Sequence, residues 1–153
     1  MSFHGDSAKD EKDIRRLLED WATAISHENL EEILASHDQH VLTFPMPEPM
    51  QLKGIDDYRE LWAAYFDWFE NKQVFGLNDL SVTAGSDVAF ATALVSCVGI
   101  TYRNRDEELG MRLTVGLRKQ DDLWRIVHVH LSRPFSRDPI GLQPESLTGV
   151  HQR

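Results

Sequence analysis

The chain of 153 residues contains very little cysteine, no long apolar run and no surplus of positive charge. Cys97 is its single cysteine, so no disulfide can form within the chain, and its place in an apolar run predicts a buried, unreactive thiol. No apolar stretch approaches the ~20 residues that a helix needs to span a bilayer. Met1 to Lys12 is polar and lacks the apolar core of a signal peptide, so a cytoplasmic location is expected.

Positive charge is scarce, because 16 Lys and Arg stand against 25 Asp and Glu and give a formal net charge of −9. Phosphate backbones are bound by clustered Lys and Arg, so this balance argues against nucleic acid and against anionic membranes as partners. The sequence also lacks a Gly-rich phosphate loop, a paired-cysteine metal motif and a Ser nucleophile elbow. We therefore expect no metal and no cofactor. The expected ligand is a small apolar or weakly acidic molecule.

Helical periodicity dominates the first part of the chain. Apolar residues recur at helical spacing between Ala8 and His27 and predict a first helix there. They are Ile14, Leu17, Leu18, Trp21 and Ile25. Ser7, followed three residues later by Asp10, is a possible N-cap, and the acidic run from Asp10 to Asp13 is expected in solvent.

A short helix, a strand and an aromatic helix are expected next. Asn29 predicts the N-cap of the short helix, and Val41 to Phe44 predicts a strand that a proline-rich segment ends. Gly54 and Asp56 open a third helix, which carries the densest aromatic stripe of the chain. The stripe consists of Tyr58, Leu61, Trp62, Tyr65, Phe66 and Phe69. Core packing explains most of these residues, and the alternative for one or two is that they line a cavity.

After Lys72 the pattern changes to that of strands, which are rich in β-branched residues. The expected strands are Val74 to Ala84, Val88 to Ile100, Met111 to Lys119 and Leu123 to Leu131. Short polar links between them predict antiparallel hairpins, and helices followed by a meander predict an α+β fold. One domain is expected over 8–134, with a C-terminal tail over 135–153. The strand from Val88 is apolar on both faces, so a partner subunit in a homodimer is expected to cover its outer face.

The closing strand, from Trp124 through His128 and His130 to Ser132, resembles that of SnoaL-like and ketosteroid-isomerase-homologue proteins. The association domain of calcium/calmodulin-dependent protein kinase II resembles it in the same place. The hairpin from Met111 and the proline-rich segment after Phe44 extend the resemblance. It implies the nuclear-transport-factor-2-like fold: a cone-shaped, strongly bent antiparallel sheet wrapped around three N-terminal helices, which leaves a cavity. Members include isomerases, cyclases, dehydratases and non-catalytic modules, so the fold does not define the function.

The resemblance also allows a comparison with true ketosteroid isomerases. Their catalytic Asp falls on Phe44 of this chain and their oxyanion-stabilising Tyr falls on Trp21. Phe44 cannot accept a proton, and Trp21 donates only through its indole N–H, so steroid isomerisation by that mechanism is not expected. Both residues are instead candidates for contact with a ligand, together with Tyr58 and Trp62 on the third helix.

Candidate catalytic residues are His128, His130 and Asp38. The two histidines lie two apart on a strand and are expected to share a face with Trp124 and Ile126, either toward the cavity or toward a dimer surface. Their roles are open between acid–base or ligand contact, a structural role, and a metal site for which no third ligand is evident. Asp38 is either an acidic group at the cavity mouth or a turn residue.

Arg112 stands in an otherwise apolar strand and offers three alternatives. A guanidinium there binds an acidic ligand, pairs with a carboxylate of the protein, or faces solvent. Two functional hypotheses follow. The first is an isomerase, cyclase or dehydratase that acts on a small, mostly apolar carbonyl compound. The second is a non-catalytic binding or assembly module that holds a small acid through Arg112.

Overall fold

The computed structural model describes residues 3–68, 74–102 and 105–134, in which helices come first and long strands follow. The helices are α1 (Phe3–Ser26), α2 (Leu30–Leu34) and α3 (Ile55–Trp68). The strands are β1 (His37–Phe44), β2 (Leu52–Lys53), β3 (Val74–Ala84), β4 (Val88–Tyr102), β5 (Arg105–Gln120) and β6 (Leu123–Ser132). The predicted α+β order is confirmed, and the predicted tail over 135–153 lies outside the described residues.

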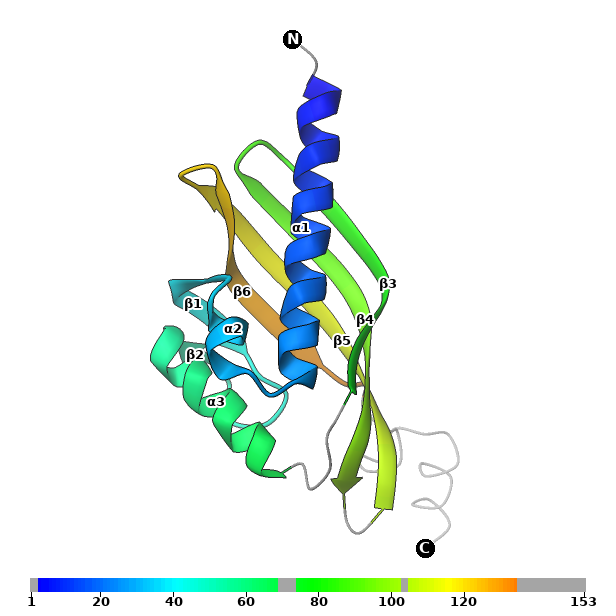
Figure 1. The fold of residues 1–153 in the computed structure, drawn as a ribbon. Coiled ribbons are helices and arrows are strands. Elements are labelled where there is room, and N and C mark those ends of the chain that lie inside the picture. Colours follow the sequence, from blue (N-terminus) through cyan, green and yellow to red (C-terminus); the bar gives the residue numbers. More distant parts are fainter. Residues whose placement is uncertain (1–2, 69–73, 103–104, 135–153) are drawn as a thin grey trace, which may run out of the picture.

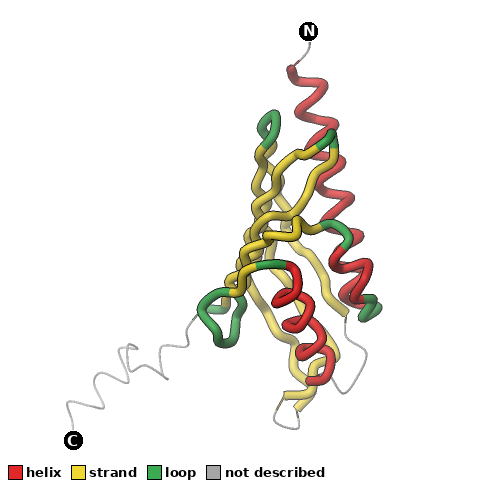
Figure 2. Tube along the Cα trace, turned by 90° about the vertical axis from the view of Figure 1, so that its left-hand side faces the viewer, coloured by secondary structure: helices red, strands yellow, loops and turns green. Residues whose placement is uncertain are grey.

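The strands form one curved sheet in the order β2-β1-β6-β5-β4-β3. The pairs from β6 to β3 are antiparallel, as the predicted hairpins require, whereas β1 joins β6 in parallel. The sheet is therefore mixed, because no short turn dictates how a strand pairs with one far along the chain. Figure 1 shows α1 lying across one face of this sheet, and Figure 2 shows the strong bend of the strands beside it.

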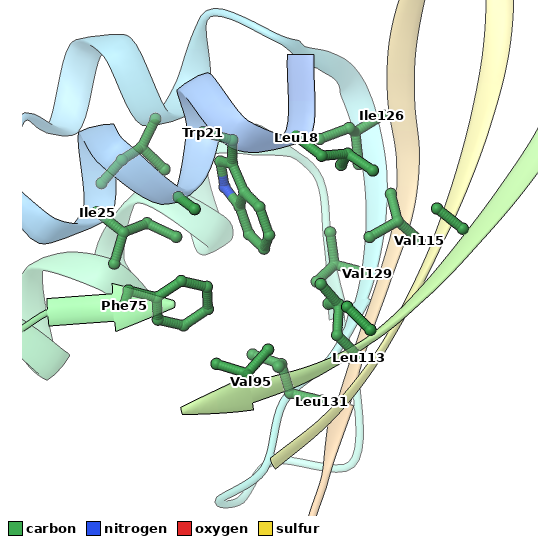
Figure 3. Packing of buried hydrophobic residues seen from close by; sticks show 14 of the residues in the cluster. Leu18, Trp21, Ile25, Phe75, Val95, Leu113, Val115, Ile126, Val129 and Leu131 are labelled. Carbon is green, nitrogen blue, oxygen red and sulfur yellow. The ribbon is translucent and has the colours of Figure 1, made fainter. Parts of the chain in front are cut away.

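The core lies between α1 and the concave face of the sheet. Ile14, Leu18, Trp21 and Ile25 of α1 are each at most 1% exposed, which confirms the predicted apolar stripe. Side chains from β4, β5 and β6 point toward this stripe in Figure 3. They include Val95, Leu113, Val115, Val129 and Leu131, and all of them are buried. None of the described helices is long and apolar enough to cross a membrane.

Helix α1 begins before the predicted N-cap, so Ser7 lies within the helix. Asp10, which was expected in solvent, is only 4% exposed. Its Oδ1 accepts hydrogen bonds from Lys119 Nζ at 3.0 Å and from Trp124 Nε1 at 3.1 Å. The prediction for Asp10 is wrong because its partners are 109 and 114 residues further along the chain, where no local pattern reveals them.

The starts of α2 and α3 agree with their sequence signals. Asn29 is the N-cap of α2, and its side chain accepts a hydrogen bond from the Glu32 N–H at 3.3 Å. Gly54 precedes α3 with a φ of 96°, a conformation that glycine adopts without strain. Its N–H donates to the carbonyl of Val41 at 2.8 Å, which connects the start of α3 to β1.

Strand β6 contains a bulge opposite β5. Gly116 pairs with His128, and the next residue, Leu117, pairs with Ile126. Val127 is therefore an extra residue on β6 that no residue of β5 opposes. An extra residue of this kind shifts the alternation of side chains by one position. Even-numbered residues therefore face the core before the bulge, and odd-numbered residues face it after the bulge.

The bulge moves the two histidines of β6 to the outer, convex face of the sheet. Trp124 and Ile126 are buried before the bulge, and Val129 is buried after it. His128 is half-buried and His130 is exposed on the other face. The prediction that both histidines share a face with Trp124 and Ile126 is therefore wrong, because simple alternation does not continue through a bulge.

Candidate functional site

Aromatic side chains from separate elements meet inside the fold. The ring of Trp21 on α1 lies 6.3 Å from that of Trp62 on α3 and 5.6 Å from that of Phe75 on β3. Tyr58, one turn before Trp62 on α3, lies 6.2 Å from it. These pairs meet edge to face, the arrangement that aromatic quadrupoles favour. Figure 3 shows Trp21 and Phe75 pointing into the same interior region as the sheet residues. We call Trp21, His37, Tyr58, Trp62 and Phe75 the interior cluster.

Hydrogen-bond donors of the interior cluster converge on the Tyr58 hydroxyl. The indole Nε1 atoms of Trp21 and Trp62 are buried and form no hydrogen bond with any described residue. Burial raises the pKa of Tyr58 far above its ordinary value, and the two indole N–H groups lie near enough to oppose part of that rise. Neither contact has the geometry of a hydrogen bond, so the two indole N–H groups and the Tyr58 hydroxyl have no hydrogen-bond partner among the described residues.

His37 provides an imidazole beside these donors. It is 6% exposed, and its ring lies 4.5 Å from the Tyr58 ring and 6.2 Å from the Trp21 ring. Burial lowers the pKa of His37 to about 3, a change that the carbonyl of Ile33 opposes only in part. The side chain is therefore neutral near neutral pH. Its Nδ1 lies 3.4 Å from Ser36 Oγ, whereas its buried Nε2 has no partner in the described part of the chain.

The buried surroundings of the interior cluster carry no free charge. Among the described residues, the buried polar or charged side chains are Asp10, His37 and Thr43. Asp10 is already paired with Lys119 and Trp124. Thr43 of β1 buries a hydroxyl without a partner among the described residues. An ionic ligand would find no counterion there, whereas a neutral polar ligand would find donors and acceptors.

A groove of ≈ 630 Å³ lies beside the interior cluster, between α1, the α2–β1 link and the β5–β6 hairpin. Trp21 and Ser36 line it together with Leu17, Trp124 and Arg125. Trp21 thus lines the groove and also contacts the interior rings, and Ser36 Oγ lies 3.4 Å from Nδ1 of His37. His37 itself is not among the residues that line the groove.

Other buried groups are unreactive. Burial raises the pKa of the Cys97 thiol to about 11, so the prediction of a buried cysteine is confirmed. Burial also raises the pKa of Tyr65, while a hydrogen bond to the Met46 backbone lowers it. Within the described ranges, no group of three or more His, Cys, Asp or Glu side chains could hold a metal ion.

The outer face of the sheet carries three of the residues predicted for the site. His128 donates from Nδ1 to the carbonyl of Leu42 at 2.7 Å, and the Phe44 ring lies 4.7 Å from the ring of His128 and 5.4 Å from that of His130. Phe44 faces away from the core on β1, because its neighbour Thr43 is the buried residue. These three residues therefore form an outer aromatic cluster, separate from the interior cluster.

Arg112 and Asp38 also lie apart from the interior cluster. Arg112 is exposed on β5, where its Nε donates to Ser132 Oγ at 3.2 Å, so the structure agrees with the solvent-facing alternative. Asp38 is half-buried, and its Oδ1 accepts a hydrogen bond from the His40 N–H at 2.8 Å. Asp38 lies within β1 and not in a turn before it, and its predicted role remains a prediction.

A family model described as a SnoaL-like domain matches residues 14–136. The chain belongs to the SnoaL-like domain family. The nuclear-transport-factor-2-like cone is its fold: an NTF2-like protein of unknown function from Pseudomonas putida KT2440 is 30% identical, with a TM-score of 0.79 over 87% of this chain and 92% of that chain. A search of curated proteins finds no significant match.

Two more distant structures share the SnoaL-like fold. A candidate dehydratase of the NTF2-like family from Streptomyces avermitilis is 17% identical, with a TM-score of 0.72 over 84% of this chain and 99% of that chain. A candidate ketosteroid isomerase from Shewanella frigidimarina is 19% identical, with a TM-score of 0.66 over 76% of this chain and 92% of that chain. At these identities the likeness concerns the fold alone.

In this SnoaL-like chain, sequence reasoning selected three members of the interior cluster: Trp21, Tyr58 and Trp62. It missed His37 and Thr43 as groups that face the interior. A signal existed for Thr43, because alternation along β1 places it on the same face as the apolar Val41. Alternation does not predict His37, because the pairing of β1 is irregular between His37 and Leu42. The roles predicted for Phe44, Arg112, His128 and His130 remain predictions, and all four lie on the outer face.

Proposed function

We propose that the interior of this SnoaL-like domain binds a small, mostly apolar, neutral carbonyl compound. The observation that carries the proposal is the convergence of unpaired Trp21 and Trp62 indole N–H groups on the Tyr58 hydroxyl. A buried donor without a partner costs about 1–3 kcal/mol. A carbonyl oxygen that accepts from these groups offsets this cost, and the surrounding aromatic rings receive the apolar part of the ligand.

Isomerisation, cyclisation or dehydration of such a compound is the reaction class that we propose. Donors that hold a carbonyl oxygen also stabilise the negative charge that develops on it when a neighbouring carbon loses a proton. The candidate dehydratase and the candidate ketosteroid isomerase that share the fold support this class. The alternative is that the chain binds such a compound without converting it. Analysis of the compound after incubation with the protein distinguishes catalysis from binding alone.

Titration with α-tetralone, followed by thermal unfolding, tests binding in the interior. At ~100 times its dissociation constant a ligand stabilises the fold by about 2.7 kcal/mol. We expect Trp62→Phe, which removes one N–H and keeps an aromatic ring, to weaken this stabilisation. Trp124→Phe is the matched control, because the Trp124 N–H already donates to Asp10. Equal stabilisation by a tetralin carboxylate, with no effect of Trp62→Phe, would refute the proposal.

In the alternative proposal Arg112 holds a small acid. The binding site would then lie on the outer face of the sheet, where Arg112 is exposed. Native mass spectrometry of the gently purified protein tests it directly. A bound mass that Arg112→Ala loses would support this alternative, and a bound mass that Arg112→Ala retains would favour the interior cluster.

We also propose that two copies of the chain assemble through the outer face. Phe90 and Leu94 on β4 are 52% and 51% exposed there, although both are large and apolar. Leu94 pairs with Arg112 of β5, so the two exposed apolar side chains of β4 lie next to a β5 side chain on the same outer face. Exposed large apolar side chains that gather on one sheet face are typical of a surface that a partner covers.

A further inference from the structure

Arg112 is a cation without a counterion on the outer face of the sheet. Its Nε donates to Oγ of Ser132, its Cα partner on β6, at 3.2 Å. Neither Nη1 nor Nη2 forms a hydrogen bond or an ion pair with a described residue. A guanidinium binds a carboxylate or a phosphate through a fork of N–H groups, and the fork of Arg112 therefore has no acceptor among the described residues.

The exposed apolar surface of β4 lies directly beside this guanidinium. Leu94 is 51% exposed and is the Cα partner of Arg112 on the neighbouring strand. The side chains of such a pair project from the same face of the sheet, with their Cβ atoms about 5 Å apart. A second copy of the chain that covers Leu94 therefore also covers Arg112 and removes its charge from water.

The sheet around Arg112 provides no carboxylate to pair with the covered charge. Its neighbours along this face of β5 are Gly110 and Thr114, and the positions beside these three residues on β4 and β6 contain no Asp or Glu. The flanking residues are Thr92, Leu94, Ser96, His130 and Ser132. A symmetric dimer brings the same surface of both copies together. A contact centred on Leu94 thus adds a second guanidinium and no carboxylate from these positions.

We infer that two copies meet around Leu94 and that the contact takes up a small oxyanion, a carboxylate or a phosphate, at Arg112. The inference rests on the proposed assembly through the outer face and adds a ligand to it. A guanidinium taken out of water without a partner is strongly destabilising, whereas an oxyanion accepts from Nη1 and Nη2 together. Thr114, next to Arg112 on the same face, provides a hydroxyl that can donate to the same anion.

The anion is part of the interface in this arrangement, whereas the alternative of a small acid held by Arg112 needs only one copy of the chain. Anything that binds the assembled form and not the separate chains stabilises the assembly by mass action. Dimerisation should therefore depend on the concentration of the oxyanion.

Sedimentation velocity in sodium chloride and in sodium phosphate of equal ionic strength tests the inference. Equal ionic strength matters because salt of any kind screens the net charge of −9 that opposes association. We expect the dissociation constant of the wild-type dimer to be about tenfold lower in phosphate than in chloride. Sodium acetate as a third buffer distinguishes recognition of a carboxylate from recognition of a phosphate, and a gain from either supports the inference.

Variants of Arg112 show whether the gain depends on its charge. Arg112→Leu should dimerise in chloride at least as tightly as the wild type and gain nothing from phosphate, because an apolar side chain needs no counterion. Arg112→Gln, which is also uncharged, replaces it if Arg112→Leu does not fold. Arg16→Leu is the matched control, since Arg16 is exposed on α1 and the phosphate gain should remain.

The outcomes separate the two proposals. If the wild type dimerises equally well in all three buffers, the inference is wrong while the proposed assembly stands. A weaker dimer of Arg112→Leu in every buffer would show that a carboxylate of the second copy pairs with Arg112, and would overturn the inference. An equal gain from phosphate in the wild type and Arg112→Leu would overturn it too, because phosphate also strengthens apolar contacts in general. If the wild type is a monomer throughout, both proposals are wrong.

Discussion

At the scale of single side chains, the buried residues Asp10 and His37 differ in whether a charged partner stabilises their ionised form. Burial alone would raise the pKa of Asp10, but hydrogen bonds from Lys119 and Trp124 outweigh it and hold the pKa below the ordinary value of 3.8. His37 has no such charged partner, and burial lowers its pKa from 6.5 to about 3. Asp10 is therefore ionised and paired in the native state, whereas His37 is kept neutral.

Replacing Asp10 by Ala should reduce the free energy of unfolding by about 2–3 kcal/mol, because Trp124 Nε1 would be left buried and unpaired. Urea denaturation followed by circular dichroism measures this loss. Asp13→Ala is the control, since the side chains of the Lys9–Asp13 pair are 74% and 47% exposed and water screens their attraction. The stabilisation by Asp10 should be complete above pH 3.8 and decline as the pH falls below it. Equal losses for the two variants would contradict this account.

Acidification should destabilise the chain through His37 in a higher pH window. The unfolded chain takes up a proton on this side chain below pH 6.5, whereas the folded chain resists until about pH 3. The free energy of unfolding should therefore fall by about 1.4 kcal/mol per pH unit below 6.5. Denaturation of wild type and His37→Phe across this window tests it, with the flatter slope expected for the variant. A His37 ring that titrates near its ordinary value by NMR would rule the prediction out.

At the scale of elements, irregular backbone positions orient the elements around the interior cluster. The bulge at Val127 turns the second half of β6 so that Val129 faces the core and His128 faces outward. Gly54 bends the chain between β2 and α3, the helix that carries Tyr58 and Trp62. The orientation of side chains in and around the interior cluster therefore depends on the bulge at Val127 and the turn at Gly54, which lie outside the cluster.

Gly54→Ala should lower the free energy of unfolding by about 1–2 kcal/mol, because a Cβ is strained at a positive φ. Space is sufficient, since the nearest atom to that Cβ would be the Gln39 carbonyl oxygen at 3.6 Å. Gly110→Ala is the matched control, because a Cβ there meets no heavy atom within 4 Å. Chemical denaturation of both variants provides the comparison. If Gly54→Ala and Gly110→Ala have similar free energies of unfolding, a Cβ at position 54 causes no strain and the prediction is wrong.

At the scale of the whole molecule, the sheet separates two chemically different surfaces. Its concave face and α1 enclose the interior cluster, and its outer face presents Phe44, Phe90, Leu94 and the two histidines of β6. The net charge of −9 opposes association over long distances, so the proposed assembly would depend on apolar contact at short range. The proposed binding in the interior and the proposed assembly through the outer face can therefore be tested with separate mutations.

Leu94→Lys should convert a homodimer into monomers, since it buries a charge in an apolar contact. Leu123→Lys is the control, because Leu123 is 58% exposed at the β5–β6 turn and away from the centre of the outer face. Sedimentation velocity of the three chains measures the outcome. A wild-type chain that sediments as a monomer would exclude the proposed homodimer, and a Leu94→Lys chain that remains dimeric would exclude this interface.

The elements of the fold could be predicted well from local patterns. Helical stripes identified α1 and α3, strand composition identified β3 to β6, and Asn29 and Gly54 marked helix starts. Each of these features depends on residues within a few positions of one another. The aromatic members of the interior cluster, Trp21, Tyr58 and Trp62, could be selected in the same way, because a helical stripe defines which side chains face inward.

The sequence by itself thus determined the α+β class, the cone fold by resemblance, and the aromatic character of the interior. Only the tertiary structure decided that Asp10 pairs with Lys119 and Trp124, that His37 is buried beside Tyr58, and that His128 and His130 face outward. The physical reason is the same in each case. These properties depend on one inserted residue in a strand, or on contacts between residues far apart along the chain, and local periodicity contains information about neither.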